Sequence, residues 1–161
     1  MYQMPLQQQK YRACAITGHR HLPDDFSKER TESILRDLIC NGVEIFYNGL
    51  ALGFDLATAT IISELKKEYP HVRLHGCIPF YGQEKYFSAE DKARYHAVLA
   101  ACDETTVFDE RYHPNSYFKR NDFMVDNSDV LFAYCVEASG GAAYTVRRFK
   151  KRKGEENIRF Y

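Results

Sequence analysis

The chain of 161 residues has 22 Lys and Arg against 22 Asp and Glu, and 45% of its residues are hydrophobic. This length and apolar fraction are typical of one globular domain and exclude a disordered or fibrous chain. The zero net charge disfavours a nucleic-acid-binding protein, which usually carries a basic excess, and no apolar stretch is long enough for a membrane span.

Short apolar strands alternate with amphipathic helices along the chain. This order predicts a Rossmann-like α/β fold, a three-layer sandwich with a mostly parallel sheet and helices on both faces. We interpret residues 1–161 as a single domain in which residues 1–10 form a short leader. The expected strands are residues 13–17, 44–47, 72–78, 105–108, 130–135 and 157–161, with Pro79-Phe80 closing the third. The expected helices follow Ser27 and Asp55, cover about 89–101 and 117–127, and begin again at Ser139-Gly140-Gly141.

The five cysteines are widely spaced and include no C-x-x-C pair. This pattern predicts reduced thiols in a cytoplasmic protein and excludes a zinc ribbon. The sequence also lacks an H-E-x-x-H arrangement. We therefore expect no metal site and no required cofactor.

The residues best suited to bind a ligand follow three of the predicted strands. In open parallel sheets, ligands bind at the carboxyl ends of the strands. Glycines let the backbone approach a ligand closely, and free N–H groups at a helix start attract phosphate. The candidate ligand-binding residues in these loops are Gly18, His19, Arg20, Gly49, Gly53, Asp55, Ser139, Gly140 and Gly141. A plain glycine turn into a helix is the competing interpretation for Gly140-Gly141.

Three of these side chains also have structural interpretations. The planar guanidinium of Arg20 suits phosphate, but it could instead pair with Asp24 or Asp25 on the surface. Asp55 could accept a hydrogen bond from a ribose hydroxyl or orient Arg20, and it could equally complement a helix start. His19 is interpreted as a simple hydrogen-bonding residue in preference to a catalytic base or a metal ligand.

Further candidates lie later in the chain. Arg120 and Asn121 are near the start of a predicted helix, where a basic residue opposes the helix dipole. This position indicates an anionic partner, which would be a bound ligand, Asp126 or Asp129. The cations of residues 147–153 come late in the last helix, where they complement its dipole, and we interpret them as a solvated helix end.

Aromatic side chains gather around the loop after the third predicted strand. A nucleobase could stack on their faces, while packing into the core or a lid explains them equally well. They are Phe80, Tyr81, Tyr86 and Phe87.

Four motifs in this order resemble the YpsA-like family of the SLOG superfamily. They are Ile16-Thr17-Gly18-His19-Arg20, the segment from Gly49 to Asp55, Arg120-Asn121 with Met124-Val125-Asp126, and Gly140-Gly141 with Thr145-Val146. The resemblance runs from about Arg12 to Lys151. It implies a bacterial or phage protein with a Rossmann-like fold, a nucleotide pocket and a role as a ligand sensor.

The same superfamily includes DprA, which binds single-stranded DNA, and the LOG phosphoribohydrolases, which cleave the N-glycosidic bond of a nucleotide. The LOG enzymes carry P-G-G-x-G-T-x-x-E, and its glutamate takes part in catalysis. The corresponding segment here, residues 139–147, has no acidic residue. This departure argues against a hydrolase of the LOG kind.

These observations predict a binding module for a nucleotide such as NAD, ADP-ribose or a nucleoside monophosphate. The alternative is a nucleotide N-glycosidase or deoxyribosyltransferase, in which Asp55 or Asp126 would be the catalytic candidate. A DNA-processing accessory like DprA ranks third because the chain has no basic excess. We expect no membrane partner, and the sequence leaves open whether the chain forms a homo-oligomer.

Overall fold

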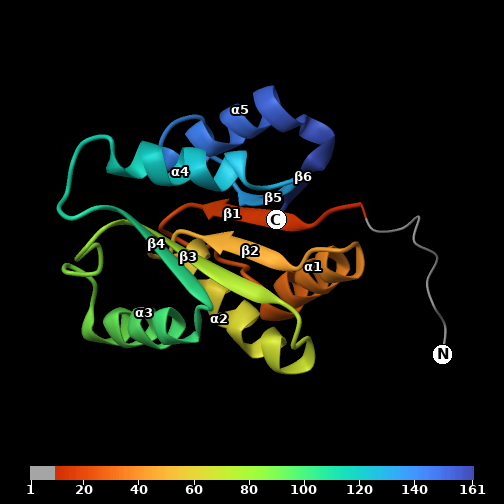
Figure 1. Ribbon diagram of the computed structural model, residues 1–161, viewed down its shortest axis with the longest axis horizontal. Helices are drawn as coiled ribbons and strands as arrows, with labels where there is room; N and C mark the ends of the chain where they lie inside the picture. The colour runs from red at the N-terminus through yellow and green to blue at the C-terminus, as the bar shows by residue number, and fades with distance from the viewer. Residues whose placement is uncertain (1–9) are drawn as a thin grey trace.

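The computed structural model describes residues 10–161, so nine of the ten residues of the predicted leader lie outside the described part. Six strands and five helices alternate along the chain (Figure 1). The strands are β1 (Ala13–Gly18), β2 (Ile45–Asn48), β3 (Arg73–Phe80), β4 (Glu104–Asp109), β5 (Val130–Tyr134) and β6 (Ile158–Phe160). The helices are α1 (Lys28–Cys40), α2 (Phe54–Glu68), α3 (Ala89–Ala101), α4 (Ser116–Asp126) and α5 (Gly141–Lys153).

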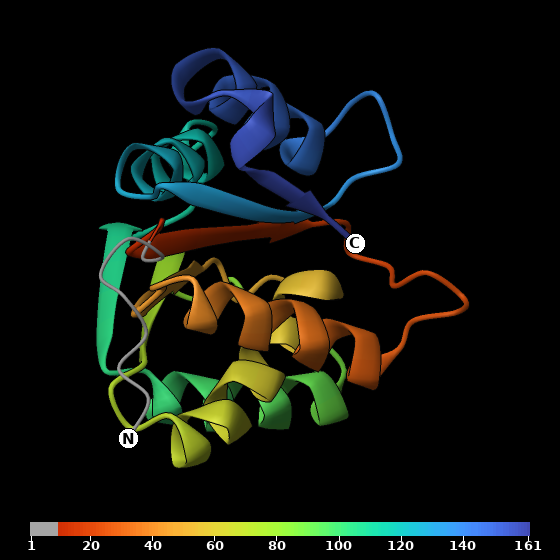
Figure 2. The same cartoon turned by 90° about the vertical axis from the view of Figure 1, so that its right-hand side faces the viewer.

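The strands form one sheet in the order β4-β3-β2-β1-β5-β6. Every neighbouring pair is parallel, so the sheet is wholly parallel where a mostly parallel one was expected. Helices α1, α2 and α3 cover one face, and α4 and α5 cover the other (Figures 1 and 2). The predicted three-layer Rossmann-like fold is confirmed.

Strand β3 ends at Phe80, two residues beyond the predicted last residue Ile78, so it includes Pro79. Its pairing with β2 stops at Gly76, after which β4 is its only neighbour. A proline has no N–H group to donate, so in a strand that is paired on both sides it can leave a hydrogen bond of the sheet unmade. Beyond Gly76 the strand is paired on one side alone, and Pro79 is therefore tolerated there.

Two hydrophobic clusters fill the space between the sheet and its two helical layers. Gly18 shows how tightly the larger one packs, because a Cβ at this position would overlap the ring of Phe54. Phe54 is fully buried and begins α2. The end of β1 must therefore be a glycine for α2 to approach the sheet. Within residues 10–161, no helix has the length and apolar character needed to span a bilayer.

The chain order reverses beside β1. From β1 the chain adds β2, β3 and β4 on one side, and then returns to place β5 on the other side. Loops that leave β1 and β5 diverge at such a point and open a crevice at the carboxyl edge of the sheet. The fold therefore brings the loop after β1 next to the loop before α5.

Candidate functional site

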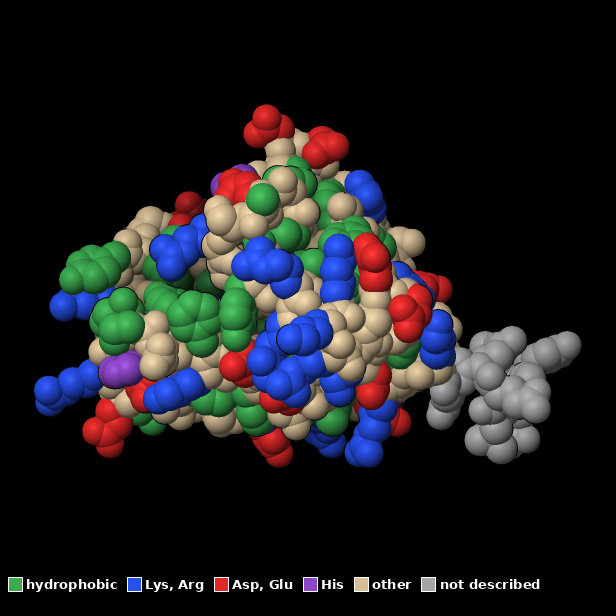
Figure 3. All heavy atoms as spheres, turned by 90° about the horizontal axis from the view of Figure 1, so that it is seen from above, with side chains coloured by type: hydrophobic (Ala, Val, Ile, Leu, Met, Phe, Trp, Pro, Cys, Tyr) green, Lys and Arg blue, Asp and Glu red, His purple; other side chains and the backbone are tan. Residues whose placement is uncertain are grey.

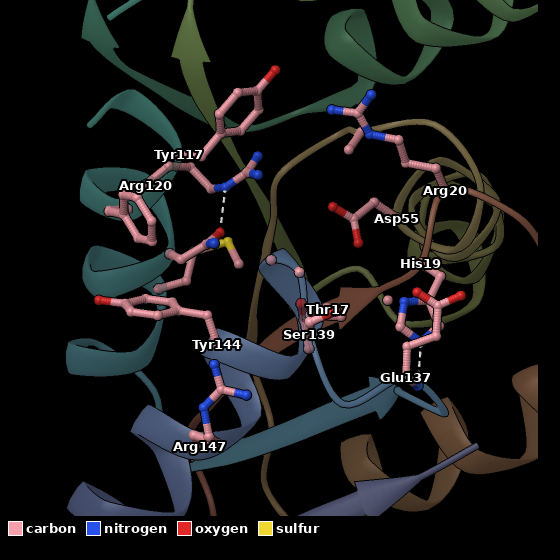
Figure 4. A pocket seen from close by; sticks show the side chains of 18 of the residues that line it. Thr17, His19, Arg20, Asp55, Tyr117, Arg120, Glu137, Ser139, Tyr144 and Arg147 are labelled. Carbon is pink, nitrogen blue, oxygen red and sulfur yellow. Dashed lines mark hydrogen bonds between the residues drawn. The ribbon is translucent and has the colours of Figure 1, made fainter. Parts of the chain in front are cut away.

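A cavity of about 650 Å³ lies at this reversal (Figure 4). It is lined by the loop after β1, the start of α2, residues of α4 between Tyr117 and Met124, and the start of α5. Nine of the predicted site residues line it, namely Gly18, His19, Arg20, Asp55, Arg120, Asn121, Ser139, Gly140 and Gly141. The structure thus brings together residues that are more than 120 positions apart in the sequence.

Gly49 and Gly53 do not line the cavity, although the sequence placed them in the ligand site. A Cβ on Gly49 would overlap the guanidinium of Arg120, and a Cβ on Gly53 would overlap the backbone carbonyl of Arg20. Both glycines therefore serve the site indirectly. Gly49 leaves room for a buried cation, and Gly53 lets the β1 and β2 loops touch.

Asp126 also lies outside the cavity. Its carboxylate accepts hydrogen bonds from Arg148 of α5 and also pairs with Arg152. Asp126 is the last residue of α4, and Met124 is the last residue of this helix that lines the cavity. This geometry separates Asp126 from the loops that line the cavity.

Arg120 is 6% exposed and points into the cavity from α4. Its Nη1 donates to the carbonyl of Gly49 at 3.1 Å, and its Nε donates to Asn121 Oδ1 at 2.7 Å. Burial lowers the pKa of this guanidinium, and the nearby Asp55 carboxylate raises it. The anionic partner of Arg120 inside the protein is therefore Asp55. Asp129 is excluded because its carboxylate accepts from the Arg12 and Ala13 amides at the other end of β1.

Asp55 is the most perturbed acid of the site. It is 5% exposed, and burial raises its pKa to about 7 against smaller opposing effects of Arg120 and the Ala51 amide. Its Oδ1 atom is buried without a hydrogen-bond partner in the described part of the chain. An unpaired buried acceptor costs about 1–3 kcal/mol, so this oxygen lacks a hydrogen-bond donor that would stabilise it.

The start of α5 presents open backbone to the cavity. Gly140 has φ +96°, a conformation that favours glycine, and a Cβ there would meet nothing within 4 Å. The first turn of α5 has no acidic side chain, so its free N–H groups are not neutralised from within the helix. These are the features of an anion site at a helix N-terminus.

Arg20 is exposed, lines the cavity and has no ion pair within residues 10–161. The suggested surface pairs with Asp24 and Asp25 are therefore absent from the described structure. Figure 4 shows its side chain at the mouth of the cavity, facing Tyr117 and Arg120.

Arg147 and Tyr144 line the cavity without having been expected there. Arg147 was predicted to lie in a solvated helix end, but its Nη1 donates to the carbonyl of Ala138 at 3.0 Å. Side chains on a helix lean toward its N-terminus, which carries Arg147 back to the loop before α5. That lean is the signal that could have identified it. The basic residues that follow it on α5, from Lys150 to Lys153, gather on the outer surface (Figure 3).

His19 ties the two loops of the cavity together. Its Nε2 accepts from the backbone N–H groups of Val136 (2.9 Å) and Glu137 (3.3 Å), and its ring stacks on that of His21. This arrangement makes His19 a positioning residue for the loop between β5 and α5.

We expect the His19→Ala substitution to speed hydrogen exchange of the Val136 and Glu137 amides about five- to tenfold, since each loses its acceptor. Hydrogen–deuterium exchange measured by mass spectrometry would show the change. His21→Ala is the matched control, because it removes a neighbouring ring and leaves the acceptor in place. Equal effects of the two substitutions would contradict this role of His19.

Among residues 10–161, no group of three or more His, Cys, Asp or Glu side chains is arranged to hold a metal ion. The five cysteines are all free thiols, and Cys14 and Cys77 are buried. The chemistry of the cavity is thus that of two buried ionisable groups, Asp55 and Arg120, two further arginines, Arg20 and Arg147, and a helix start.

Comparisons with known proteins identify relatives of this chain. The sequence profile of the YpsA family, described as the YspA SLOG family, matches residues 15–161. A UPF0398 protein of Bacillus velezensis is 31% identical over 160 residues, covering 91% of this chain and 88% of that protein. The UPF0398 protein YpsA of Bacillus subtilis is 30% identical over 160 residues, covering 91% and 89%.

Among solved structures, DNA processing protein A from Helicobacter pylori superposes with a TM-score of 0.64 at 19% identity, covering 96% of this chain and 67% of that one. That structure was described for its single-stranded DNA binding mode. The likeness at this identity concerns the fold.

Proposed function

The chain belongs to the YpsA family of SLOG proteins, and from that premise we propose that its cavity binds a nucleotide or nucleotide-derived ligand. The single observation that carries the proposal is the buried, unpaired Oδ1 of Asp55 in a cavity that also holds Arg120 and the open start of α5. One part of the cavity attracts an anion, and another part lacks a hydrogen-bond donor.

A nucleotide supplies both missing partners in one molecule. Its phosphate would accept from the N–H groups at Gly140-Gly141 and pair with Arg20, while a ribose hydroxyl would donate to Asp55 Oδ1. A volume of about 650 Å³ is in the range of small-ligand sites. We propose that the protein acts in this way as a cytoplasmic ligand sensor.

Single-stranded DNA is the ligand that the structure of Helicobacter pylori DprA addresses. For this chain we favour a small ligand, because a polyanion needs a continuous basic track and Asp55 would lie against it. The chain also has no excess of basic over acidic residues.

We expect isothermal titration with the four common nucleoside 5′-monophosphates to detect binding of at least one. The Arg20→Ala variant should bind it about tenfold more weakly, because one charge-assisted hydrogen bond is lost. Arg111→Ala is the matched control, since Arg111 is exposed and lies outside the cavity. Absence of binding by the wild type at millimolar nucleotide, or an equal loss in both variants, would refute the proposal.

The pKa of about 7 for Asp55 favours a second candidate function, hydrolysis of an N-glycosidic bond. The bond between C1′ and the base would break as Asp55 donates a proton to the leaving base, a water molecule would add to C1′, and the proton that this water releases would return to the Asp55 carboxylate. Chromatography of the titrated samples separates the two functions. Release of free base by the wild type but not by the Asp55→Asn variant indicates an enzyme. Nucleotide that stays intact with the wild type indicates a binding module.

A further inference from the structure

A second cavity, of about 520 Å³, lies beside the first and shares Arg20, Ala51 and Tyr117 with it. We infer that this second cavity, here called the aromatic annex, takes a ring of the ligand. The ligand would then be a dinucleotide, with one nucleoside in the main cavity and the aromatic base of the other in the annex. The inference rests on the proposed function and states how far the ligand extends.

The annex is built from aromatic rings. The ring of Phe80 lies 5.4 Å from that of Tyr112 and 5.7 Å from that of Tyr117, both edge-on. Tyr86 is 88% exposed and Tyr112 is 63% exposed, although both line the annex. Large aromatic side chains that remain uncovered around one hollow mark a binding surface. Figure 3 shows hydrophobic side chains gathered around a hollow beside the basic surface of α5.

The loop that carries Tyr86 is linked to Arg120 of the main cavity through one backbone carbonyl group. Gln83 Nε2 donates to the carbonyl of Gly49 at 3.0 Å, and Arg120 Nη1 donates to the same carbonyl at 3.1 Å. One oxygen atom therefore holds both a wall of the annex and the buried cation of the main site. This shared acceptor argues that the two cavities form one ligand site.

The charges of the annex indicate how its occupant is attached. No Asp or Glu lines it, and its only charged residue is Arg20, which stands at the junction and has no ion pair within residues 10–161. These charges suit a ligand whose neutral ring lies in the annex and whose anionic linker lies against Arg20. The diphosphate of a dinucleotide is such a linker.

Three probes that carry the same best-binding base test the inference: the nucleoside monophosphate, its nucleoside diphosphate sugar and its symmetrical dinucleoside diphosphate. We expect the dinucleoside diphosphate to bind about tenfold tighter than the diphosphate sugar, because stacking of one base on aromatic rings has this magnitude. Tyr86→Ala and Tyr112→Ala should each reduce this tenfold advantage at least threefold and leave monophosphate binding unchanged.

Tyr81→Ala is the matched control, because Tyr81 is 66% exposed on the same loop and lines a different hollow. It should keep the full advantage of the dinucleoside diphosphate. If the wild type binds the nucleoside diphosphate sugar and the dinucleoside diphosphate with equal affinity, the annex does not bind a base, and the proposed function still stands. Failure of all three probes to bind would overturn both.

Discussion

Substitution of Gly53 by alanine is expected to lower the free energy of unfolding by about 2–5 kcal/mol. Two costs combine at this position. Gly53 has φ +82°, which strains any residue with a Cβ, and that Cβ would overlap the carbonyl groups of His19 and Arg20. Backbone atoms cannot swing aside as a flexible side chain does, so the loop after β1 would have to move. Urea denaturation of the variant and the wild type measures the difference.

Gly82→Ala separates the two costs. Gly82 has a similar φ of +89°, but nothing lies within 4 Å of a Cβ there. We therefore expect only the conformational strain, about 1 kcal/mol. If Gly53→Ala and Gly82→Ala destabilise the protein equally, then the close approach of the two loops at Gly53 contributes nothing to stability.

The layers of the fold could be predicted because hydrophobic periodicity is a local property. The apolar run at residues 130–135 indicated a buried strand, and β5 is buried throughout. The end of β3 was predicted two residues early, at Ile78, because the effect of a proline depends on how many strands flank it. That number is a property of the whole sheet.

Part of the candidate site could also be predicted, because the ends of the strands are visible in the sequence. Arg20, Asp55 and the Gly140 turn follow strands, and the rule for parallel sheets places such residues at one edge. The partner of Arg120 could not be found from spacing, since Asp55 lies on another helix and 65 positions away. Gly49 and Gly53 were assigned to the ligand because a glycine pattern does not distinguish ligand contact from packing.

The Asp55→Asn substitution tests whether the buried carboxyl group of Asp55 lowers the free energy of unfolding. Burial raises the pKa of Asp55 from 3.8 to about 7, so the folded protein keeps a proton that the unfolded chain releases between these values. The contribution of this carboxyl to stability is therefore complete below pH 4 and is lost as the pH rises through 7. About three pKa units correspond to about 4 kcal/mol.

At pH 8 we accordingly expect Asp55→Asn to be more stable than the wild type by up to about 4 kcal/mol, and at pH 4 we expect the two to differ little. Urea denaturation at both pH values measures the gain. Asp126→Asn is the matched control, because that carboxylate is exposed and paired on the surface. A gain for Asp55→Asn that does not depend on pH would show that the carboxyl is ionised in the fold without cost. A gain confined to high pH means that a buried charge beside Arg120 opposes folding, and a ligand hydroxyl on Oδ1 would relieve part of that cost.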